Sequence, residues 1–288
     1  MNICFFTENH YKGGLDTFII NLINAWPSNN DNLTLICNES HPGFETIKNK
    51  ISRVTKFKKY SRLFTSRISQ GQSTLKYGQS YFVRIFFVLA FRLLQYPILF
   101  PWYVLSLALY FRRSNFDRLM VINGGYPASL LCRCAIISWR LSGKKSLATL
   151  NFHNSAIKPP WYFSFPEYLI DMAVNWSVGY VVTVSKNCLN TLKSKRGFLN
   201  NNKLRYIYNG VADPARNINN ENTVTIKSDS IKPYCLMLAT YEERKGHEYL
   251  LRAFKIVVEK IPESFLRIYG YGRDKEKKQI INTIKKFN

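Results

Sequence analysis

The sequence predicts an α/β protein built around a parallel sheet, and three observations lead to this prediction. Short runs of β-branched and other apolar residues alternate with stretches of helical length. No internal repeat with a period of about 20 to 50 residues interrupts this alternation. The chain has 288 residues, of which 46% are hydrophobic and 20% charged, a balance typical of one large core or two smaller ones.

The first predicted strand covers residues 2–7, an apolar run that reads as fully buried. Five further runs of the same kind are expected to form strands. They are residues 33–38, 118–123, 146–151, 179–184 and 204–208. Because helical intervals separate most of these runs, the strands should lie parallel in one sheet with helices on both faces.

The helical intervals are identified by apolar residues that recur every three to four positions. Residues 14–25 place Leu15, Phe18, Ile19, Leu22 and Ile23 on one side of a helix. Residues 127–141 and 161–176 form two more helical intervals, and Pro166 is expected to kink or break the second of them.

The composition changes near residue 215, where a polar, Asn-rich stretch begins. Residues 215–232 therefore read as a linker between an N-terminal Rossmann-like domain, residues 1–214, and a C-terminal domain, residues 233–288. In the second domain we expect strands at 234–239 and 265–269, a helix at 246–260 and a last amphipathic helix that extends to 287. Two strands leave sheet edges open, so this domain looks cut short.

One segment departs from the α/β pattern, because residues 81–111 are almost wholly apolar. Between residues 46 and 118 the sequence holds fourteen Lys or Arg residues and one acidic residue, Asp117. Basic side chains beside aromatic-rich helices suit the surface of an anionic lipid leaflet. Two other readings remain open: a pair of buried core helices with a solvated loop, or a spanning helix over the charge-free residues 93–111, which Pro97 and Pro101 interrupt.

The charge and the cysteines restrict the class of protein. A formal net charge of +23 favours partners that carry phosphate. Nucleic acid is not expected, since no helix-turn-helix, RNP or zinc-finger pattern is present.

The six cysteines form no CxxC pair, and the first residues lack the basic start of a secretory signal, so a reducing cytoplasm is expected. Cys132 and Cys134 would point to different sides of a helix, which argues against a shared metal.

Two turns could bind phosphate. Gly13 and Gly14 follow the first strand and open the first helix, where free backbone N–H groups can approach an anion. Arg244, Lys245 and Gly246 occupy the corresponding turn of the second domain, with Lys245 at the start of a helix. A tight β-to-α turn and a solvated charged turn are the structural alternatives.

The order of these motifs resembles the GT-B glycosyltransferases of the family-4 type, the retaining, nucleotide-sugar-dependent group. Four stretches carry the resemblance. They are GGLDTFIINL from Gly13, TLNFHN with His153 and Asn154, the pair VVTVS ending at Ser185 and NGV from Asn209 and Gly210, and the stretch from residue 234 through Arg244, Lys245, Gly270 and Gly272. Together they extend over essentially the whole chain.

This resemblance implies a GT-B fold with two Rossmann-like halves and the transfer of a hexose from a nucleoside diphosphate sugar to a lipid-linked or polysaccharide acceptor. Cell-surface polysaccharide or lipopolysaccharide biosynthesis is the implied context. His153 would face the sugar, and Lys245, Arg244 and the Gly13–Gly14 amides would stabilise the leaving diphosphate. The remaining positions implied to contact substrate are Asn154, Ser185, Asn209, Gly210, Gly270 and Gly272.

No metal or cofactor is expected, because the sequence has no DxD-type acidic cluster and its other histidines, His10, His41 and His247, read as surface or loop residues. The expected location is cytoplasmic, peripheral on the inner face of the cell membrane.

Two departures from the family's pattern stand out. Thr240 occupies the position of the family's Arg, and no two glutamates have the Glu-x7-Glu spacing, so the chain looks C-terminally truncated and inactive as given. The alternative is a non-catalytic remnant that acts as a membrane-associated, acceptor-binding module.

Overall fold

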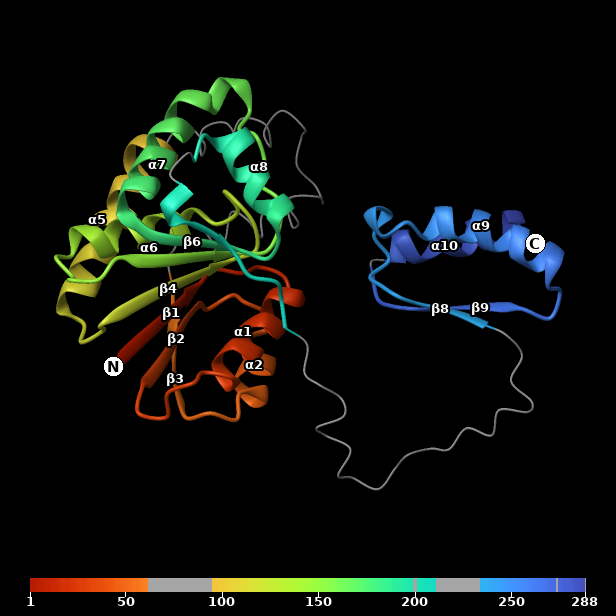
Figure 1. Cartoon of the computed structure of the whole chain (residues 1–288), viewed down its shortest axis with the longest axis horizontal. Helices are drawn as coiled ribbons and strands as arrows, with labels where there is room; N and C mark the ends of the chain where they lie inside the picture. The colour runs from red at the N-terminus through yellow and green to blue at the C-terminus, as the bar shows by residue number, and fades with distance from the viewer. Residues whose placement is uncertain (62–94, 199–200, 211–233, 273, 288) are drawn as a thin grey trace, which may run out of the picture. The chain divides into compact units, whose positions relative to one another are not determined.

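The computed structural model describes residues 1–61, 95–198, 201–210, 234–272 and 274–287 (Figure 1). The chain divides into two compact units, Met1–Val211 and Ala212–Asn288. The expected linker at 215–232 and residues 81–94 of the apolar segment lie outside the described residues. The predicted α/β class is confirmed in the first unit.

The first unit contains a seven-stranded, wholly parallel sheet. Its strands are β1 (Asn2–Thr7), β2 (Asn32–Asn38), β3 (Thr55–Tyr60), β4 (Arg118–Asn123), β5 (Ala148–Phe152), β6 (Val178–Thr183) and β7 (Leu204–Tyr206). The order across the sheet is β3-β2-β1-β4-β5-β6-β7. β1 is therefore central and pairs with both β2 and β4.

Helices cover both faces of this sheet, as the sequence predicts. On one face, α1 (Gly14–Asn24) and α2 (Phe44–Lys50) bury Ile19, Ile23 and Ile47 against alternate residues of β1 and β2. The other face is covered by α5 (Phe100–Arg113), α6 (Leu130–Leu141), α7 (Ser164–Ser177) and α8 (Lys186–Arg196). Figure 1 shows α1 and α2 on the opposite side of the sheet from α5, α6 and α7.

Three elements differ from the sequence-based expectation. Residues 161–163 form a short 3-10 turn, and α7 begins at Ser164, so Pro166 lies in its first turn. The interval therefore divides two residues before Pro166, in line with the expected break. No kink is needed in α7 itself, because a proline in the first turn removes only an N–H that has no partner inside the helix. α2, β3 and α8 were not predicted. β3 and α8 are rich in lysine, as expected of an edge strand and of a helix with a solvated face.

The described part of the apolar segment is a core-covering helix. A turn over Gln95–Leu99 leads into α5, which buries Tyr103, Val104, Leu107 and Phe111. α5 packs on α6, where the Ser138 hydroxyl donates to the Val104 carbonyl at 2.7 Å. Among the residues that the structure describes, we find no helix with both the length and the apolar character needed to span a bilayer. One side of α5 thus packs into the core, while Trp102, Leu105 and Leu109 on its other side are exposed.

A buried ionic network joins α6, α7 and α8. Arg133 forms two hydrogen bonds with the Glu167 carboxylate, at 2.8 and 3.1 Å, and Arg196 bonds to the same group. Arg196 also pairs with Asp171 at 3.3 Å, and the Tyr126 hydroxyl donates to Asp171 at 2.6 Å. Burial would raise the pKa of Glu167, but the two guanidinium groups hold it below its usual value. Burial raises the pKa of Asp171 to about 6.

The second unit contains the elements expected from its sequence. β8 (Tyr234–Leu238) and β9 (Phe265–Tyr269) form a parallel pair, and α9 (His247–Lys260) connects them. A 3-10 turn over Glu243–Lys245 precedes α9, and α10 (Asp274–Phe287) follows β9. Backbone hydrogen bonds continue the pairing beyond the strands, from Ala239 to Tyr269 and from Tyr241 to Tyr271.

Candidate functional site

The carboxyl edge of the first sheet contains a topological switch point between β1 and β4. After β1 the chain proceeds to β2 and β3 on one side, and it then returns to β4 on the other. Loops that leave two such neighbouring strands diverge and open a crevice, which is where ligands bind in open α/β sheets. The loop from Glu8 to Gly14 follows β1, and Gly124 and Gly125 follow β4.

The Gly13–Gly14 turn opens α1 toward this crevice. A Cβ added at either glycine would meet nothing within 4 Å, so the space in front of the backbone is open. Gly13 has no side chain that could cap the helix, and its backbone is extended (φ 178°). The first N–H groups of an α-helix have no acceptor within the helix. The turn therefore leaves open space at the positive end of the helix dipole, where the Gly13 N–H is bonded to Asp16.

Asp16 and its neighbours hold this turn in place. The Asp16 carboxylate accepts hydrogen bonds from the Gly13 N–H at 3.2 Å and from the Asn9 amide at 3.0 Å. The imidazole Nε2 of His41 lies 3.0 Å from the same carboxylate. Asn38 completes the frame: its amide donates to the Asn9 carbonyl at 2.9 Å, and its oxygen accepts the Asn9 N–H at 2.8 Å.

His41 lies in the loop after β2, as a loop residue expected from the sequence, but it is not at the surface: its side chain is completely buried against Asp16. His247 is a second correction, because it is the first residue of α9 and is also buried, next to the Tyr241 ring. Tertiary packing buries both histidines, and the partner of His41 is distant in the sequence. A single histidine in a predicted loop gives no sign of such burial.

His153 follows β5, two strands from β1, at the same edge of the sheet. Its imidazole packs edge-to-face on Phe18 of α1, with ring centres 4.1 Å apart. The Nε2 atom is buried and has no hydrogen-bond partner among the described residues. Burial lowers the pKa of His153 to about 4. At neutral pH the ring is therefore uncharged.

Asn154 and the Gly124–Gly125 pair connect His153 to the switch point. The Asn154 amide donates to the Gly124 carbonyl at 2.7 Å. A Cβ on Gly125 would lie 3.5 Å from that of Asn154, and one on Gly124 would lie 4.0 Å from the Leu15 side chain of α1. The structure thus brings together Gly13, Gly14, His153 and Asn154 at one sheet edge. The glycine pair was not predicted as part of the site, although its position directly after a predicted strand is a usable signal.

Glu8 is a second residue of the site that the sequence analysis missed. It follows β1 and is buried, and its carboxylate accepts a hydrogen bond from the Ser129 hydroxyl. Ser129 in turn caps α6 by accepting the Cys132 N–H at 3.1 Å. The other carboxylate oxygen of Glu8 and the Asn123 amide nitrogen are buried without a hydrogen-bond partner among the described residues. These polar groups lie at the ends of β1 and β4.

Three predicted site residues of the first unit lie further along the edge. The Ser185 hydroxyl caps α8 and accepts the Cys188 N–H at 3.2 Å, so its side chain supports the fold. Asn209 and Gly210 follow β7, the strand furthest from β3, and both are exposed. The structure does not bring these three to the switch point.

In the second unit the predicted residues meet at the carboxyl ends of β8 and β9. Lys245 is exposed in the turn before α9, and Gly246 continues this turn with φ +74°, which favours glycine. A Cβ on Gly270 would lie 1.8 Å from the Ala239 carbonyl oxygen, so only glycine fits. The Thr240 hydroxyl donates to Glu242 at 2.7 Å and braces the turn.

Gly272 contacts the same 239–241 segment, since an added Cβ would lie 2.7 Å from Cβ of Tyr241. The side chain of Arg244 lies outside the described residues. Both ring nitrogens of the buried His247 have no hydrogen-bond partner among the described residues. Lys245, Gly270, Gly272 and the N-terminus of α9 thus gather at one end of the second unit.

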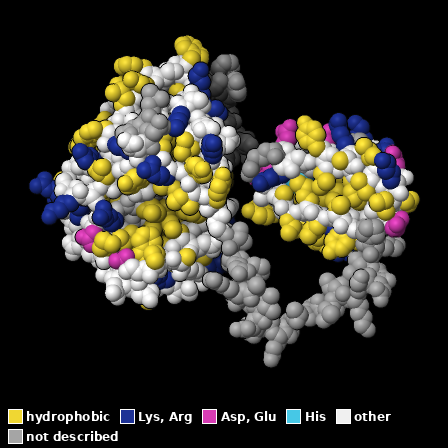
Figure 2. All heavy atoms as spheres, viewed as in Figure 1, with side chains coloured by type: hydrophobic (Ala, Val, Ile, Leu, Met, Phe, Trp, Pro, Cys, Tyr) yellow, Lys and Arg dark blue, Asp and Glu magenta, His cyan; other side chains and the backbone are white. Residues whose placement is uncertain are grey.

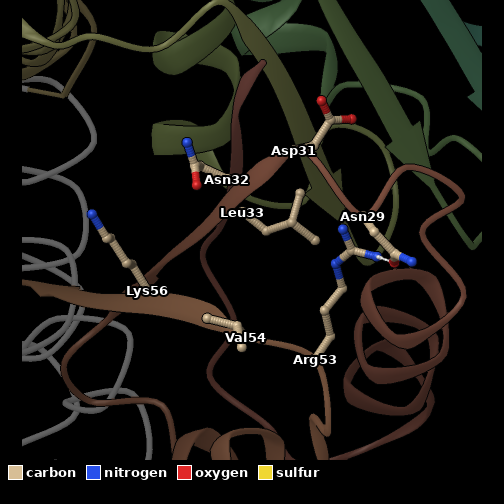
Figure 3. A pocket seen from close by; sticks show the side chains of 7 residues that line it. All are labelled: Asn29, Asp31, Asn32, Leu33, Arg53, Val54 and Lys56. Atoms are coloured by element: carbon tan, nitrogen blue, oxygen red, sulfur yellow. Dashed lines mark hydrogen bonds between the residues drawn. The ribbon is translucent and has the colours of Figure 1, made fainter.

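A separate hollow of about 270 Å³ lies at the amino ends of β2 and β3, away from the switch point (Figure 3). It is lined by Asn29, Asp31, Asn32, Leu33, Arg53, Val54 and Lys56. Arg53 points to Asn29 and donates to the Trp26 carbonyl at 2.9 Å, while Asp31 accepts the Trp26 indole N–H at 2.9 Å. These charged groups are engaged in holding the 26–31 turn, so we assign the hollow a structural role.

Metal-binding side chains are dispersed in the part of the chain that the structure describes, which contains no group of three His, Cys, Asp or Glu residues able to hold an ion. Five of the six cysteines are buried and Cys235 is exposed, all as free thiols. Burial raises the pKa of Cys37 and Cys132 to about 12, so these thiols stay protonated.

Solved structures of low sequence identity share this fold. A glycosyltransferase from Rickettsia africae matches with a TM-score of 0.59 at 14% identity, over 99% of this chain and 65% of that protein. A variant of S. aureus TarM in complex with fondaparinux, α-GlcNAc-glycerol and UDP matches with a TM-score of 0.54 at 11% identity, over 99% and 75%. The UDP-GlcNAc 2-epimerase from Neisseria meningitidis, bound to UDP-GlcNAc, also scores 0.54, at 12% identity, over 99% and 70%.

The chain therefore spans less than two thirds of the length of the Rickettsia africae protein. No protein-family model and no curated protein sequence matches it. The likeness establishes the GT-B type of fold, which glycosyltransferases and sugar-nucleotide epimerases share.

Proposed function

We propose that the chain belongs to a glycosyltransferase that transfers a hexose from a nucleoside diphosphate sugar to a lipid-linked or polysaccharide acceptor, in the retaining, family-4 manner. The observation that carries the proposal is the position of His153. Its unpartnered, buried Nε2 lies at the same sheet edge as the Gly13–Gly14 turn, where an added side chain would meet open space. A ligand with several hydroxyl groups and a phosphate suits this combination of donors and acceptors.

His153 would act as an uncharged hydrogen-bonding group. With its pKa lowered to about 4, the imidazole is neutral at physiological pH and can bond to a sugar hydroxyl without adding charge to the site. Phe18 fixes the ring plane from one side. The role that this geometry supports is orientation of the sugar, since a base with so low a pKa is a weak proton acceptor.

The Gly13–Gly14 turn would approach the substrate by its backbone. The space around the two glycines is open, and the dipole of α1 favours a negatively charged group beside it, while the Gly13 N–H itself donates to Asp16. Asp16, His41 and Asn9 hold the turn in one conformation before the substrate arrives. Such preorganised donors stabilise developing charge without a cost of reorganisation at the moment of reaction.

Lys245 and Arg244 would supply positive charge to the diphosphate in the second unit. The chemistry requires it, because the diphosphate gains negative charge as the glycosidic bond breaks. Lys245 stands directly before α9, so its ammonium group and the amides of the helix act on an anion together. Gly270 and Gly272 allow the 239–241 segment to pass close to the end of β9.

We further propose that the protein works at the inner face of the cell membrane, where a lipid-linked acceptor would be located. The support is the charge of the chain, +23 overall, together with apolar side chains exposed on α5. The related proteins in complex with UDP or UDP-GlcNAc make a uridine nucleotide the first donor class to test.

The test is donor binding followed by transfer. We would titrate the purified chain with UDP- and GDP-hexoses by calorimetry and compare Lys245→Ala with Lys255→Ala, an exposed lysine of α9 in the same unit. Loss of a charge-assisted contact to diphosphate should cost about 2 kcal/mol, or roughly thirtyfold in affinity, at Lys245 alone.

His153→Ala should weaken binding of the sugar nucleotide more than binding of the free nucleotide. Equal losses for the two lysine variants would contradict the assignment of Lys245. Conversion of the donor to a 2-epimer without acceptor would contradict transfer as the reaction and would place the chain functionally with the epimerases of this fold.

A further inference from the structure

Helix α7 turns its carboxylates inward and its aromatic side chains outward. Glu167 and Asp171 are each only 5% exposed. The outward side carries a stripe of large apolar residues that recur every three to four positions. They are Phe165, Tyr168, Leu169, Met172 and Trp176, each at least 49% exposed. A surface helix in contact with water shows the opposite arrangement, so this stripe indicates a covering surface that is not water.

The ionic network fixes α7 in this orientation. Arg133 and Arg196 bond to Glu167. Arg196 also forms an ion pair with Asp171, and the Tyr126 hydroxyl donates to Asp171. A roll of α7 that hid the aromatic stripe would pull both carboxylates away from these partners. Two buried guanidinium groups would then have no counter-charge, which is strongly unfavourable. The outward stripe is therefore a fixed feature of the fold.

α5 presents a second stripe of the same kind. Trp102, Leu105 and Leu109 are each at least 55% exposed, while the opposite side of the helix packs into the core. α6 lies between α5 and α7 and packs against both. We call the exposed apolar residues of α5 and α7 the α5–α7 surface. Figure 2 shows hydrophobic side chains at the surface of the first unit, with Lys and Arg side chains among them.

Cations flank this surface at the ends of its helices. Arg112 and Arg113 end α5, and the Arg140 guanidinium lies 5.0 Å from the centre of the Trp176 ring. The Lys203 ammonium donates to the Asn175 carbonyl at 2.7 Å. Burial and the nearby Arg140 lower the pKa of Lys203, so these two cations lie close together.

Few exposed acids offset these cations. Residues 112–211 contain fourteen Lys or Arg residues and three acidic residues, of which Glu167 and Asp171 face inward and Asp117 is exposed. The partner that complements this surface must therefore offer an apolar phase and negative charge side by side. An anionic lipid leaflet has both, acyl chains beneath and phosphate groups at the surface.

We propose that the α5–α7 surface docks on an anionic lipid leaflet, with both helices lying in the plane of the interface. The aromatic rings occupy the boundary between headgroups and acyl chains, and Arg112, Arg113, Arg140 and Lys203 contact lipid phosphates. This inference deepens the membrane placement in the proposed function, on which it rests. It moves the main contact to α7, which lies outside the apolar segment at 81–111.

The experiment is flotation of the full-length chain with vesicles, in the absence of any sugar nucleotide. Vesicles of phosphatidylcholine alone are compared with vesicles that also contain phosphatidylglycerol. Only the anionic vesicles should bind the parent chain. The double variant Leu169→Ser/Met172→Ser and the triple variant Arg112→Gln/Arg113→Gln/Arg140→Gln should each bind at least about tenfold more weakly.

Matched controls remove the same amounts of apolar area and charge elsewhere. Tyr249→Ser/Ile256→Ser alters two exposed apolar residues of α9, and Lys186→Gln/Lys193→Gln/Lys195→Gln removes three charges from α8. Both controls should bind like the parent, and far-ultraviolet circular dichroism should show that every variant is folded. Equal losses in variants and controls, or equal binding to both kinds of vesicle, would overturn the proposal.

Two further outcomes separate this inference from the proposed function. Intact donor binding without vesicle binding would overturn the docking surface alone, and vesicle binding without donor binding would overturn the proposed transferase alone. A parent chain that dimerises and ignores vesicles, with a monomeric Leu169→Ser/Met172→Ser variant, would assign the surface to a second copy and overturn the lipid proposal.

Discussion

The imidazole Nε2 of His41 lies 3.0 Å from the Asp16 carboxylate, and this buried pair joins the loop after β2 to the first turn of α1. The same carboxylate holds the Gly13 N–H. The conformation of the glycine turn is therefore set through Asp16 by His41, which lies 25 positions after Asp16 in the chain. A proposed substrate contact thus depends on a side chain that has no contact with substrate.

Gly43 should be intolerant of substitution for this reason. Its φ of −88° suits any residue, but an added Cβ would lie 2.3 Å from the Asp16 carboxylate and 2.7 Å from His41 Nε2. Gly43→Ala should therefore destabilise the fold by about 2 kcal/mol, measured by urea unfolding. Gly13→Ala is the matched control and should cost less than about 0.5 kcal/mol, since its Cβ meets open space. Similar losses in the free energy of unfolding for the two variants would show that the Asp16–His41 pair does not restrict position 43.

Glu167→Gln should be the most destabilising single change in the ionic network. The substitution leaves Arg133 without a carboxylate partner and Arg196 with Asp171 alone, so we expect a loss of about 3 to 5 kcal/mol in the free energy of unfolding. Glu45→Gln serves as the control. It breaks only the exposed pair with Lys59, which is 3.2 Å long, and should cost under about 1 kcal/mol. A small loss at Glu167 would mean that water or other groups compensate the arginines.

His153 should make the protein less stable in mild acid. Its pKa is about 4 in the folded chain against an ordinary value of 6.5, so below about pH 6.5 the unfolded chain binds a proton that the folded chain does not. The contribution of His153 to the free energy of unfolding is thus constant above about pH 6.5 and declines as the pH falls toward about 4. We would compare urea unfolding of the parent and of His153→Gln at about pH 7 and about pH 5. The parent should lose more stability than the variant, and an equal loss would contradict the low pKa.

Gly270→Ala should unfold the second unit, because the new Cβ would lie 1.8 Å from a backbone oxygen that cannot move aside without breaking the β8–β9 pairing. The expected loss is more than about 3 kcal/mol, seen as rapid amide exchange over residues 234–287. Gly210→Ala, where an added Cβ meets nothing within 4 Å, should leave exchange in that unit unchanged. Protected amides in Gly270→Ala would contradict the close approach.

Apolar strands and amphipathic helices could be predicted because their residue types respond to local burial. β1 and β4 carry continuous apolar runs, and the structure places them in the middle of the sheet. β3 could not be recognised in the same way, because three of its six residues are lysines that face solvent at the edge of the sheet. α8 had recognisable signals in its Ser185 cap and in Gly197 after its last residue, but Ser185 was interpreted as a substrate contact.

The candidate site was predictable only in part. Gly13, Gly14 and His153 follow recognisable strands, and the parallel sheet brings strand ends to one edge. The burial of His41 depends on a contact across 25 residues, which no local pattern encodes. The orientation of α7, with its carboxylates buried and its apolar residues exposed, could not be predicted for a related reason. Its carboxylates look solvent-exposed in the sequence until Arg133 and Arg196 are known to lie beneath them.

The strand order also constrains how the first unit can assemble during synthesis on a ribosome. β1, β2 and β3 all lie within the first 60 residues and can pair as soon as they emerge. The other edge of β1 finds its partner only when β4 appears, since Ile3 pairs with Arg118. A nascent chain therefore carries an apolar, unpaired strand edge while more than a hundred residues are translated. Slow translation before β4 would prolong this exposure, and holdase chaperones would have their most effective binding site there.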